Sequence, residues 1–389
     1  MSRPRIELTR RDLTSQPVFW GGLRTTFGVA HRGALKDTRP DDLLAELIRA
    51  RALIPGLAEI VTGCAYPEGE QGYNIGRVAG LGAGLELPGM TVNRLCGSAL
   101  ESAAIAAAGV ISGRADAFLV AGVESMSRVP RRGANFSESM RVRERAPQAY
   151  VTMGETAENV ARKYPRLSRA AQEEFASASH AAASLAWQSG FYDDHVVKVN
   201  GMTMDESIRH PANREKMASL PPAFLADGVV TAATSSPMSD GAAIGLVTSE
   251  KVARDHGTRN YLRVIDNVAS HVDPEVMGLG PVPAVRKLLD RHHLAPSDIA
   301  AVEMNEAFAV QVLACVDELR LDPRTVNTKG GALAIGHPLG ASGLRLLMTL
   351  HARMAEDATP GSLGIATLCV GGGQGIAMLV EFVNREIAS

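Results

Sequence analysis

Cysteines, aromatic residues and net charge are all scarce in this 389-residue sequence, and each scarcity excludes a class of protein. Four dispersed cysteines without a Cys-x-x-Cys pair argue against a disulfide scaffold and against a zinc ribbon. Aromatic residues make up 4% of the chain and the net charge is −2, so neither base stacking nor a basic surface for nucleic acid is expected. No metal site is expected either.

Long apolar runs are absent as well. No stretch reaches the roughly 18 apolar residues of a membrane-spanning helix, and Met1 to Glu7 lack the apolar core of a signal peptide. We therefore expect a cytoplasmic protein with free thiols and no membrane span. Hydrophobic residues make up 46% of the chain, which is enough for a large core, and the length suggests two or three structural units.

Short apolar runs alternate with helical stretches of small residues, a pattern typical of an α/β architecture. The first part of the chain predicts strands at 59–63, 90–93 and 117–122, with a helix at 98–111. The last part repeats this order, with strands at 301–304, 364–369 and 376–380 and a helix at about 341–355. The tripeptide Thr-Val-Asn occurs in both parts, at 91–93 and 325–327, which favours two similar halves.

The middle of the chain, from about 126 to 236, has a different composition. Residues 128–145 are charged and rich in turn formers, and helices are predicted at 155–163 and 168–189. A proline-rich strip follows at 220–224. We interpret this region as a long insertion that rejoins the first half at about Met238.

Cys96 lies between a predicted strand and a predicted helix. The positive end of a helix dipole favours the thiolate, and backbone N–H groups at the turn could bind an oxyanion. The alternative is a buried cysteine that serves as a small hydrophobic residue. Cys64 and Cys315 have no sequence neighbours that suggest activation, so they are expected in the core.

Three further segments could carry chemistry. Asn305 follows a predicted strand and would either cap a helix or position a water or carbonyl. His337 lies in the glycine-rich segment 330–343, where missing Cβ atoms allow close approach, although a lone histidine is often structural. Cys369 begins a glycine turn that is either an anion-binding nest or a plain hairpin.

Together the segments 93–98, 305–309, 330–343 and 369–375 resemble the thiolase family in order and spacing, over a region from about Arg24 to Val380. The resemblance implies an α/β thiolase fold: two similar βαβαβαββ halves in a five-layer αβαβα core with an inserted loop domain. The implied division is an N-terminal half at 1–125 plus 238–258, an inserted CoA-binding loop domain at 126–237, and a C-terminal half at 259–389.

The resemblance also implies roles for single residues. Cys96 would be the nucleophile, His337 its base, and Cys369 the acid and base that handles the second proton. One oxyanion hole would combine His337 with a water held by Asn305, and the other the backbone N–H groups of Cys96 and Gly371. Coenzyme A would be a co-substrate rather than a permanently bound cofactor. Its expected contacts, and those of the acyl and pantetheine path, are Arg209, Phe224, Ser236, Met153 and Phe308.

Within the family, the segments 303–309, 234–236 and 373–375 look most like thiolases of fatty-acid degradation, and Thr152 replaces a histidine of the biosynthetic group. The expected reaction is therefore β-oxidation thiolysis of 3-ketoacyl-CoA, through an acyl-Cys96 intermediate. The alternatives are a biosynthetic acetyl-CoA acetyltransferase, a ketoacyl synthase-type relative, and a non-catalytic CoA- or lipid-binding relative. The resemblance implies a homodimer or homotetramer, and it raises a complex with a multifunctional fatty-oxidation subunit.

Overall fold

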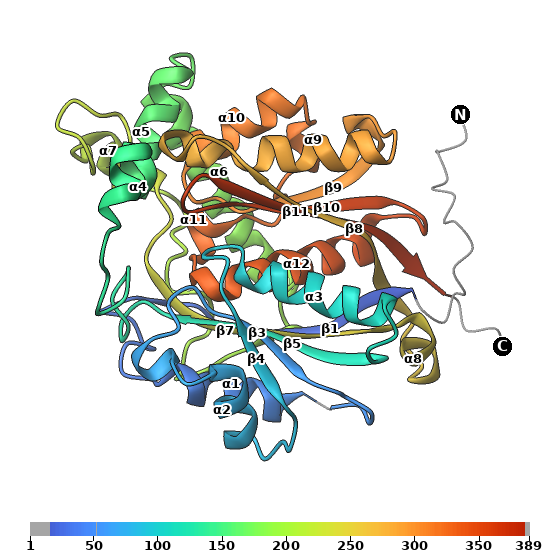
Figure 1. The fold of residues 1–389 in the computed structure, drawn as a ribbon. Helices are drawn as coiled ribbons and strands as arrows, with labels where there is room; N and C mark the ends of the chain where they lie inside the picture. The colour runs from blue at the N-terminus through green and yellow to red at the C-terminus, as the bar shows by residue number, and fades with distance from the viewer. Residues whose placement is uncertain (1–15, 52, 386–389) are drawn as a thin grey trace.

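A computed structural model describes residues 16–51 and 53–385 of the chain (Figure 1). The strands are β1 (Pro17–Thr25), β2 (Gly28–Val29), β3 (Ile60–Gly63), β4 (Gly89–Val92), β5 (Ala117–Ser125), β6 (Val196–Val197), β7 (Ser239–Ser249), β8 (Asn260–His271), β9 (Ile299–Met304), β10 (Leu363–Val370) and β11 (Gln374–Asn384). The helices are α1 (Pro40–Ala50), α2 (Ile75–Gly82), α3 (Ser98–Ile111), α4 (Met140–Arg145), α5 (Met153–Lys163), α6 (Arg169–Gln188), α7 (Arg214–Ser219), α8 (Glu250–Asp255), α9 (Pro281–Arg291), α10 (Ala309–Leu319), α11 (Ala332–Ile335) and α12 (Ser342–Asp357).

The strands follow the order β4-β3-β5-β7-β1-β8-β11-β10-β9, with β2 beside β7 and β6 beside β1. β3 runs parallel to β4 and β5, and β10 runs parallel to β9, whereas β1, β7, β8 and β11 pair antiparallel with their neighbours in this order. β1 and β8 join through the pairs Val18–Arg263 and Phe19–Leu262. Figure 1 shows that the strands on either side of this junction form two separate layers.

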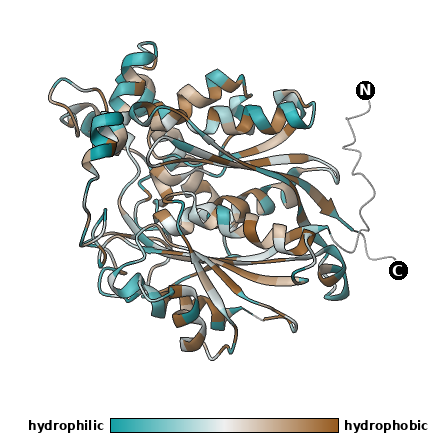
Figure 2. Cartoon of the chain, viewed as in Figure 1, coloured by the Kyte–Doolittle hydropathy of each residue, from teal (hydrophilic) through white to brown (hydrophobic). Residues whose placement is uncertain are grey.

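Helices α3 and α12 lie between the two sheet layers, α1 and α2 cover the outer face of one, and α9 and α10 cover the outer face of the other (Figure 1). This arrangement confirms the predicted five-layer αβαβα core. Helix α3 consists largely of Ala, Gly and Ser and is buried around most of its circumference, as a helix between two sheets requires. Figure 2 shows the strands as mostly hydrophobic and α4, which lies outside the core, as largely hydrophilic.

The order of elements repeats between the two halves. The first half runs β1-α1-β3-α2-β4-α3-β5-β7, and the second runs β8-α9-β9-α10-α12-β10-β11 with the short α11 before α12. Residues 325–327, the expected counterpart of 91–93, contribute only the isolated bridge Val302–Val326. The reason is local: Thr325 belongs to a 3-10 turn at Pro323–Thr325 and Asn327 has a φ of 48°, so only Val326 is extended.

The region between β5 and β7 corresponds to the expected insertion. β5 and β7 are antiparallel neighbours, so the chain leaves the sheet at Ser125 and returns beside the same strand at Ser239. The predicted helices are present as α5 and α6, and the side chain of Ser168 caps α6 by accepting from the N–H of Ala171. The domain boundaries at 126 and 237 stay a prediction.

Among the described residues, no helix is long and apolar enough to cross a bilayer. The segment from Met1 to Glu7, expected not to be a signal peptide, lies outside the described residues.

Candidate active site

The turn that carries Cys96 is held in a strained conformation. It connects β4 to α3, and Leu95 has a φ of 45°, which β-carbon-bearing residues rarely adopt. Leu95 donates its N–H to Asn93 Oδ1 at 2.8 Å, and Ser98 Oγ donates to the Leu95 carbonyl at 2.6 Å. Backbone strain of this kind persists only where neighbouring contacts enforce it. The turn therefore presents Cys96 in one orientation, two residues before α3 begins.

The β10–β11 hairpin packs directly against this turn. A Cβ on Gly97 would lie 2.9 Å from Val370 Cγ2 and 3.0 Å from Ile376 Cγ2, so glycine is required for the close approach. The backbone N–H of Gly371 forms a hydrogen bond with the Cys96 thiol, and the Cys369 thiol lies near enough to Cys96 for the two to interact electrostatically. The structure thus brings together Cys96, Cys369 and Gly371.

His337 lies in the loop after α11, where Gly336 has a φ of 110°. Its backbone N–H donates to Ser239 Oγ at 3.0 Å, and its ring Nδ1 lies 2.6 Å from Ser342 Oγ. Because the Ser342 hydroxyl donates to the Pro338 carbonyl, Ser342 Oγ must accept from Nδ1–H. The neutral ring therefore carries its lone pair on Nε2, which is the nitrogen that a base needs.

Asn305 is not a helix cap. Helix α10 begins at Ala309 with Phe308 in the capping position, so the capping interpretation is wrong. Asn305 is fully buried at the end of β9, and its Nδ2 lies 3.3 Å from His337 Nε2. Its Oδ1 accepts a hydrogen bond from Arg345 Nη2 at 3.2 Å. The amide therefore faces the imidazole of His337.

Glu124 connects the histidine loop to the N-terminal half. Its buried carboxylate accepts from the N–H groups of Ala65 and Gly340, both at 2.8 Å, and from Gln71 Nε2 at 2.7 Å. Leu339, two residues after His337, packs in the same small apolar cluster as Cys96. Glu124 and Ser342 were missed from sequence. Ser342 lies inside the glycine-rich segment, five positions after His337. This short separation was the one feature of the sequence that could have indicated a contact between them.

Burial shifts the pKa values of the three titratable groups of the candidate site. It raises the pKa of Cys96 to about 11, and the hydrogen bond from Gly371 N–H opposes this only in part. Burial, aided by the positive charge of Arg345, lowers the pKa of His337 to about 3. Burial, followed by the neighbouring Cys96, raises the pKa of Cys369 well above its usual value. The resting groups are two thiols and a neutral imidazole.

This protonation state predicts how Cys96 responds to pH. Between pH values of about 5 and 9 neither group of the Cys96–His337 pair gains or loses a proton overall, so transfer between them is independent of pH. The rate of Cys96 alkylation by iodoacetamide is therefore expected to be flat over this range and to rise as the pH approaches about 11. Peptide mass spectrometry would measure it. A rise centred near pH 6–7 would instead show a thiolate–imidazolium pair formed by an ordinary histidine.

Four of the five expected contacts for CoA and the acyl path lie together. The rings of Phe224 and Phe308 meet edge to face at 5.8 Å, and the N–H of Ser236 donates to the carbonyl of Ala307 at 3.0 Å. Met153 packs on the apolar cluster that includes Phe308 and Cys369. Arg209 stands apart: its side chain is exposed, its backbone N–H donates to His180 Nδ1, and within the described chain no contact joins it to the other four.

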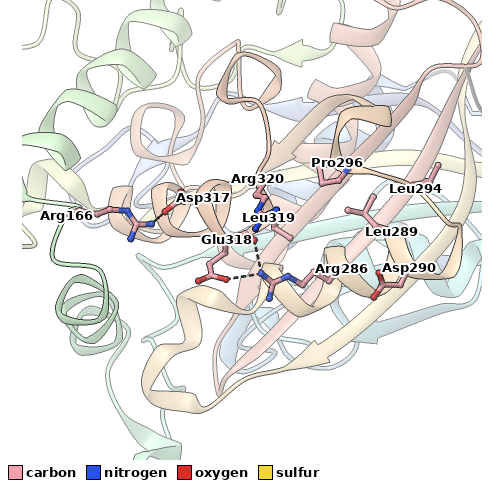
Figure 3. Close-up of a pocket in the computed structure, with 10 residues that line it drawn as sticks. All are labelled: Arg166, Arg286, Leu289, Asp290, Leu294, Pro296, Asp317, Glu318, Leu319 and Arg320. Atoms are coloured by element: carbon pink, nitrogen blue, oxygen red, sulfur yellow. Dashed lines mark hydrogen bonds and ion pairs between the residues drawn. The ribbon is translucent and has the colours of Figure 1, made fainter. Parts of the chain in front are cut away.

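A groove of about 650 Å³ lies elsewhere on the surface, along α9 and α10 (Figure 3). None of the predicted site residues lines it, and four of its charged side chains form the ion pairs Arg286–Glu318 and Arg166–Asp317. The groove is therefore not the active site.

The five-layer fold, the neighbouring thiols Cys96 and Cys369 and the buried His337 fit a class of acyl-transferring enzymes. The N-terminal domain of thiolase matches residues 18–251 and the C-terminal domain of thiolase matches residues 259–382. The chain belongs to the thiolase family.

Proteins similar to this chain cover nearly its whole length. It is 38% identical to the 3-ketoacyl-CoA thiolase of Bacillus subtilis (strain 168) over 390 residues, which span 94% of this chain and 99% of that protein. It is 40% identical to the 3-ketoacyl-CoA thiolase FadA of Escherichia coli (strain K12), over 95% of this chain and all of that one. The crystal structure of the dimeric peroxisomal thiolase of Saccharomyces cerevisiae superimposes with a TM-score of 0.86 at 32% identity, covering 97% of this chain and 99% of that chain.

Proposed function

We propose that this thiolase cleaves 3-ketoacyl-CoA with free CoA, giving acetyl-CoA and an acyl-CoA shortened by two carbons. The observation that carries the proposal is the meeting of two thiols, Cys96 and Cys369, with the Gly371 N–H bonded to the first. A ketoacyl synthase-type reaction is less favoured. Such an enzyme would be expected to carry a second histidine or an asparagine beside its cysteine and histidine, whereas this chain carries the thiol of Cys369.

In the first half-reaction, Cys96 Sγ attacks the 3-keto carbonyl carbon while His337 Nε2 takes the thiol proton. The bond between carbons 2 and 3 breaks, and its electron pair leaves as the enolate of acetyl-CoA. Cys369 donates its proton to carbon 2 of that enolate. The products are free acetyl-CoA, an acyl-Cys96 thioester, the Cys369 thiolate and a protonated His337.

In the second half-reaction, the Cys369 thiolate takes the proton of incoming CoA, and the CoA sulfur attacks the acyl carbon. The Cys96 sulfur leaves and recovers its proton from His337. Every group is then back in its resting state. The raised pKa of Cys369 suits this role, since a thiol that holds its proton firmly protonates a carbanion and its thiolate is a strong base.

Two oxyanion holes follow from the same geometry. The N–H groups of Cys96 and Gly371 are the proposed donors to the acyl oxygen, and the Gly371 N–H already points at the Cys96 sulfur. Asn305 and His337 are the proposed donors to the enolate oxygen, with a water between Asn305 and substrate. Neutral His337 accepts from Asn305 Nδ2, whereas protonated His337 cannot, so proton transfer releases the amide N–H when charge develops.

The degradative direction is supported by the relatives, whose names specify 3-ketoacyl-CoA thiolase. Thr152 caps α5 through a reciprocal bond pair with Glu155 rather than carrying an imidazole into the site. The biosynthetic condensation of two acetyl-CoA molecules uses the same steps in reverse and is the second candidate. A role in β-oxidation in the cytoplasm is part of this proposal.

We place CoA along the inserted region 126–237, with Phe224, Met153, Phe308 and Ser236 beside its pantetheine arm and Arg209 at its phosphates. A homodimer is the proposed assembly. It is supported by the dimeric yeast relative and by the outer edge of β4, which pairs with no other strand of the described chain. Tyr73 is 97% exposed, and the side chain of the next residue, Asn74, donates to the Gly89 carbonyl of β4. A homotetramer and a complex with a multifunctional fatty-oxidation subunit are alternatives that sedimentation of the purified protein would distinguish.

The test is thiolysis of 3-ketoacyl-CoA substrates from four to sixteen carbons, followed by loss of the 3-ketoacyl-CoA absorbance after CoA is added. We expect CoA-dependent cleavage with turnover in the usual range of about 1–10³ s⁻¹ for at least part of the series. Activity on the four-carbon substrate alone would favour the biosynthetic candidate. Absence of CoA-dependent cleavage throughout the series would refute the proposed function.

A further inference from the structure

The orientation of the Asn305 amide is set by the group behind it. An arginine guanidinium has only hydrogen-bond donors, so the atom of Asn305 that faces Arg345 Nη2 at 3.2 Å must be the amide oxygen. The amide nitrogen is thereby directed to the opposite side, toward His337 Nε2. Without Arg345, the two ends of the amide would be nearly interchangeable in shape, and the oxygen could face the site instead.

Arg345 is poorly suited to a purely structural role. It is fully buried on α12, and the bond to Asn305 is the one hydrogen bond that its guanidinium makes with any residue the structure describes. Its nearest carboxylate, Glu303, lies 3.6 Å away and makes its own short hydrogen bond to Arg353 instead. A buried ion pair with unsatisfied donors contributes little to stability, and an apolar side chain of similar size would cost less to bury.

The charge of Arg345 also acts on the histidine. Arg345 is the one cation that contributes to lowering the pKa of His337, after burial itself. Neutral His337 has one lone pair, on Nε2, which accepts the N–H of Asn305 in the resting enzyme and takes the Cys96 proton when that proton displaces the bond. Arg345 therefore acts on two groups that contact each other, the amide of Asn305 and the imidazole of His337.

We propose that Arg345 is a positioning residue of this thiolase: it holds the Asn305 amide with its N–H groups directed into the active site, toward the Nε2 lone pair of His337, and a bond donated to that lone pair favours the neutral imidazole. Glu303 lies on the other side of the Arg345 guanidinium, at 3.6 Å. The expected loss of turnover rests on the proposed function. The expected effect on His337 does not, because alkylation of Cys96 reports it in the absence of substrate.

The experiment compares Arg345→Met with wild-type enzyme in two assays. Thiolysis is expected to fall on the order of 10- to 100-fold in kcat, as for loss of other supporting contacts, with an unchanged KM for CoA. Alkylation of Cys96 by iodoacetamide at neutral pH is expected to become faster. The reason is that a higher pKa of His337 lets it hold the Cys96 proton in a larger fraction of molecules. A general loss of folded protein would not lower the thiolysis rate and at the same time selectively raise the rate of Cys96 alkylation in the folded molecules.

Arg353→Met is the matched control. Arg353 lies on the same helix and bonds to the same Glu303, together with the carbonyls of Val302 and Thr325, yet it does not contact Asn305. It is expected to lower stability more than Arg345→Met while leaving kcat per folded molecule and the alkylation rate near wild type. Circular dichroism gives the folded fraction for each variant. Equal effects of the two substitutions in both assays would overturn the proposal.

Two further variants keep the proposal testable if Arg345→Met folds poorly. Arg345→Lys retains a donor-only cation, so it is expected to restore the alkylation rate and part of kcat; no recovery in either assay would contradict the proposal.

In an Asn305→Ala background, Arg345→Met should cause little further loss of kcat, because the amide that Arg345 positions is already gone. Additive losses would show that Arg345 acts elsewhere. If wild-type enzyme lacked thiolysis, the proposed function would fail while the alkylation comparison would still decide the effect on His337.

Discussion

Replacing Cys96 by alanine is expected to lower thiolysis by about 10⁴- to 10⁶-fold, the loss typical of removing an enzyme's nucleophile. Without the sulfur no acyl-enzyme forms, and the remaining groups can only orient a direct attack of CoA. Initial rates with a 3-ketoacyl-CoA substrate and excess CoA measure the loss. Intact-protein mass spectrometry, after mixing with substrate in the absence of CoA, should show an acyl adduct on the wild type and none on Cys96→Ala.

Cys315→Ala provides the matched control for this prediction. Cys315 is a fully buried thiol whose sulfur donates to the Gly278 carbonyl at 3.3 Å, and it lies on α10 in the apolar cluster around β9 and β10. Its loss should cost about 1–2 kcal/mol of unfolding free energy and leave kcat nearly unchanged. Substantial turnover in Cys96→Ala, or an acyl adduct on Cys315, would sink the assignment of the nucleophile.

Local sequence patterns predicted the elements that position the nucleophile. Helix α3 was expected at about 98–111 and has these bounds, because the segment after Gly97 is rich in alanine, the strongest helix former. The five-layer arrangement did not follow from such patterns. It came from the resemblance to a family, since alternation of strands and helices fits several α/β folds. The reduced strand at 325–327 shows the limit of this approach, because a preceding proline turn changed the local geometry.

The candidate site also contains residues that local sequence patterns predicted and residues that they did not. Cys96, His337 and Cys369 lie in or beside turns that contain glycine and are visible in the sequence, whereas their supporting partners are distant along the chain. Glu124 and Gly340 are separated by 216 positions, and Asn305 and Arg345 by 40. No periodicity encodes such contacts.

The raised pKa of Cys96 could not be predicted from the sequence for a related reason. A helix dipole depends on neighbouring residues, which the sequence shows. Burial depends on the whole fold, and it is the main cause of the raised pKa.

Replacing Cys369 by alanine should separate the two half-reactions. Cys369 is 2% exposed and sits at the end of β10, where alanine keeps the hairpin and the neighbouring Gly371 N–H in place. Cys96 and His337 remain, so the variant should still become acylated. Protonation of the enolate and deprotonation of CoA lose their catalyst, so steady-state thiolysis is expected to fall by about 10²- to 10⁴-fold.

Intact-protein mass spectrometry during turnover should therefore find Cys369→Ala carrying an acyl group on Cys96, whereas the wild type clears it when CoA is in excess. The pH dependence gives a second check. A free base in solution can replace a missing general base, so turnover by the variant should rise with pH and with added small amines, and wild-type turnover should not. Unimpaired turnover would remove the acid–base role of Cys369. Failure to acylate would show that its thiol is needed earlier, for the attack of Cys96 itself.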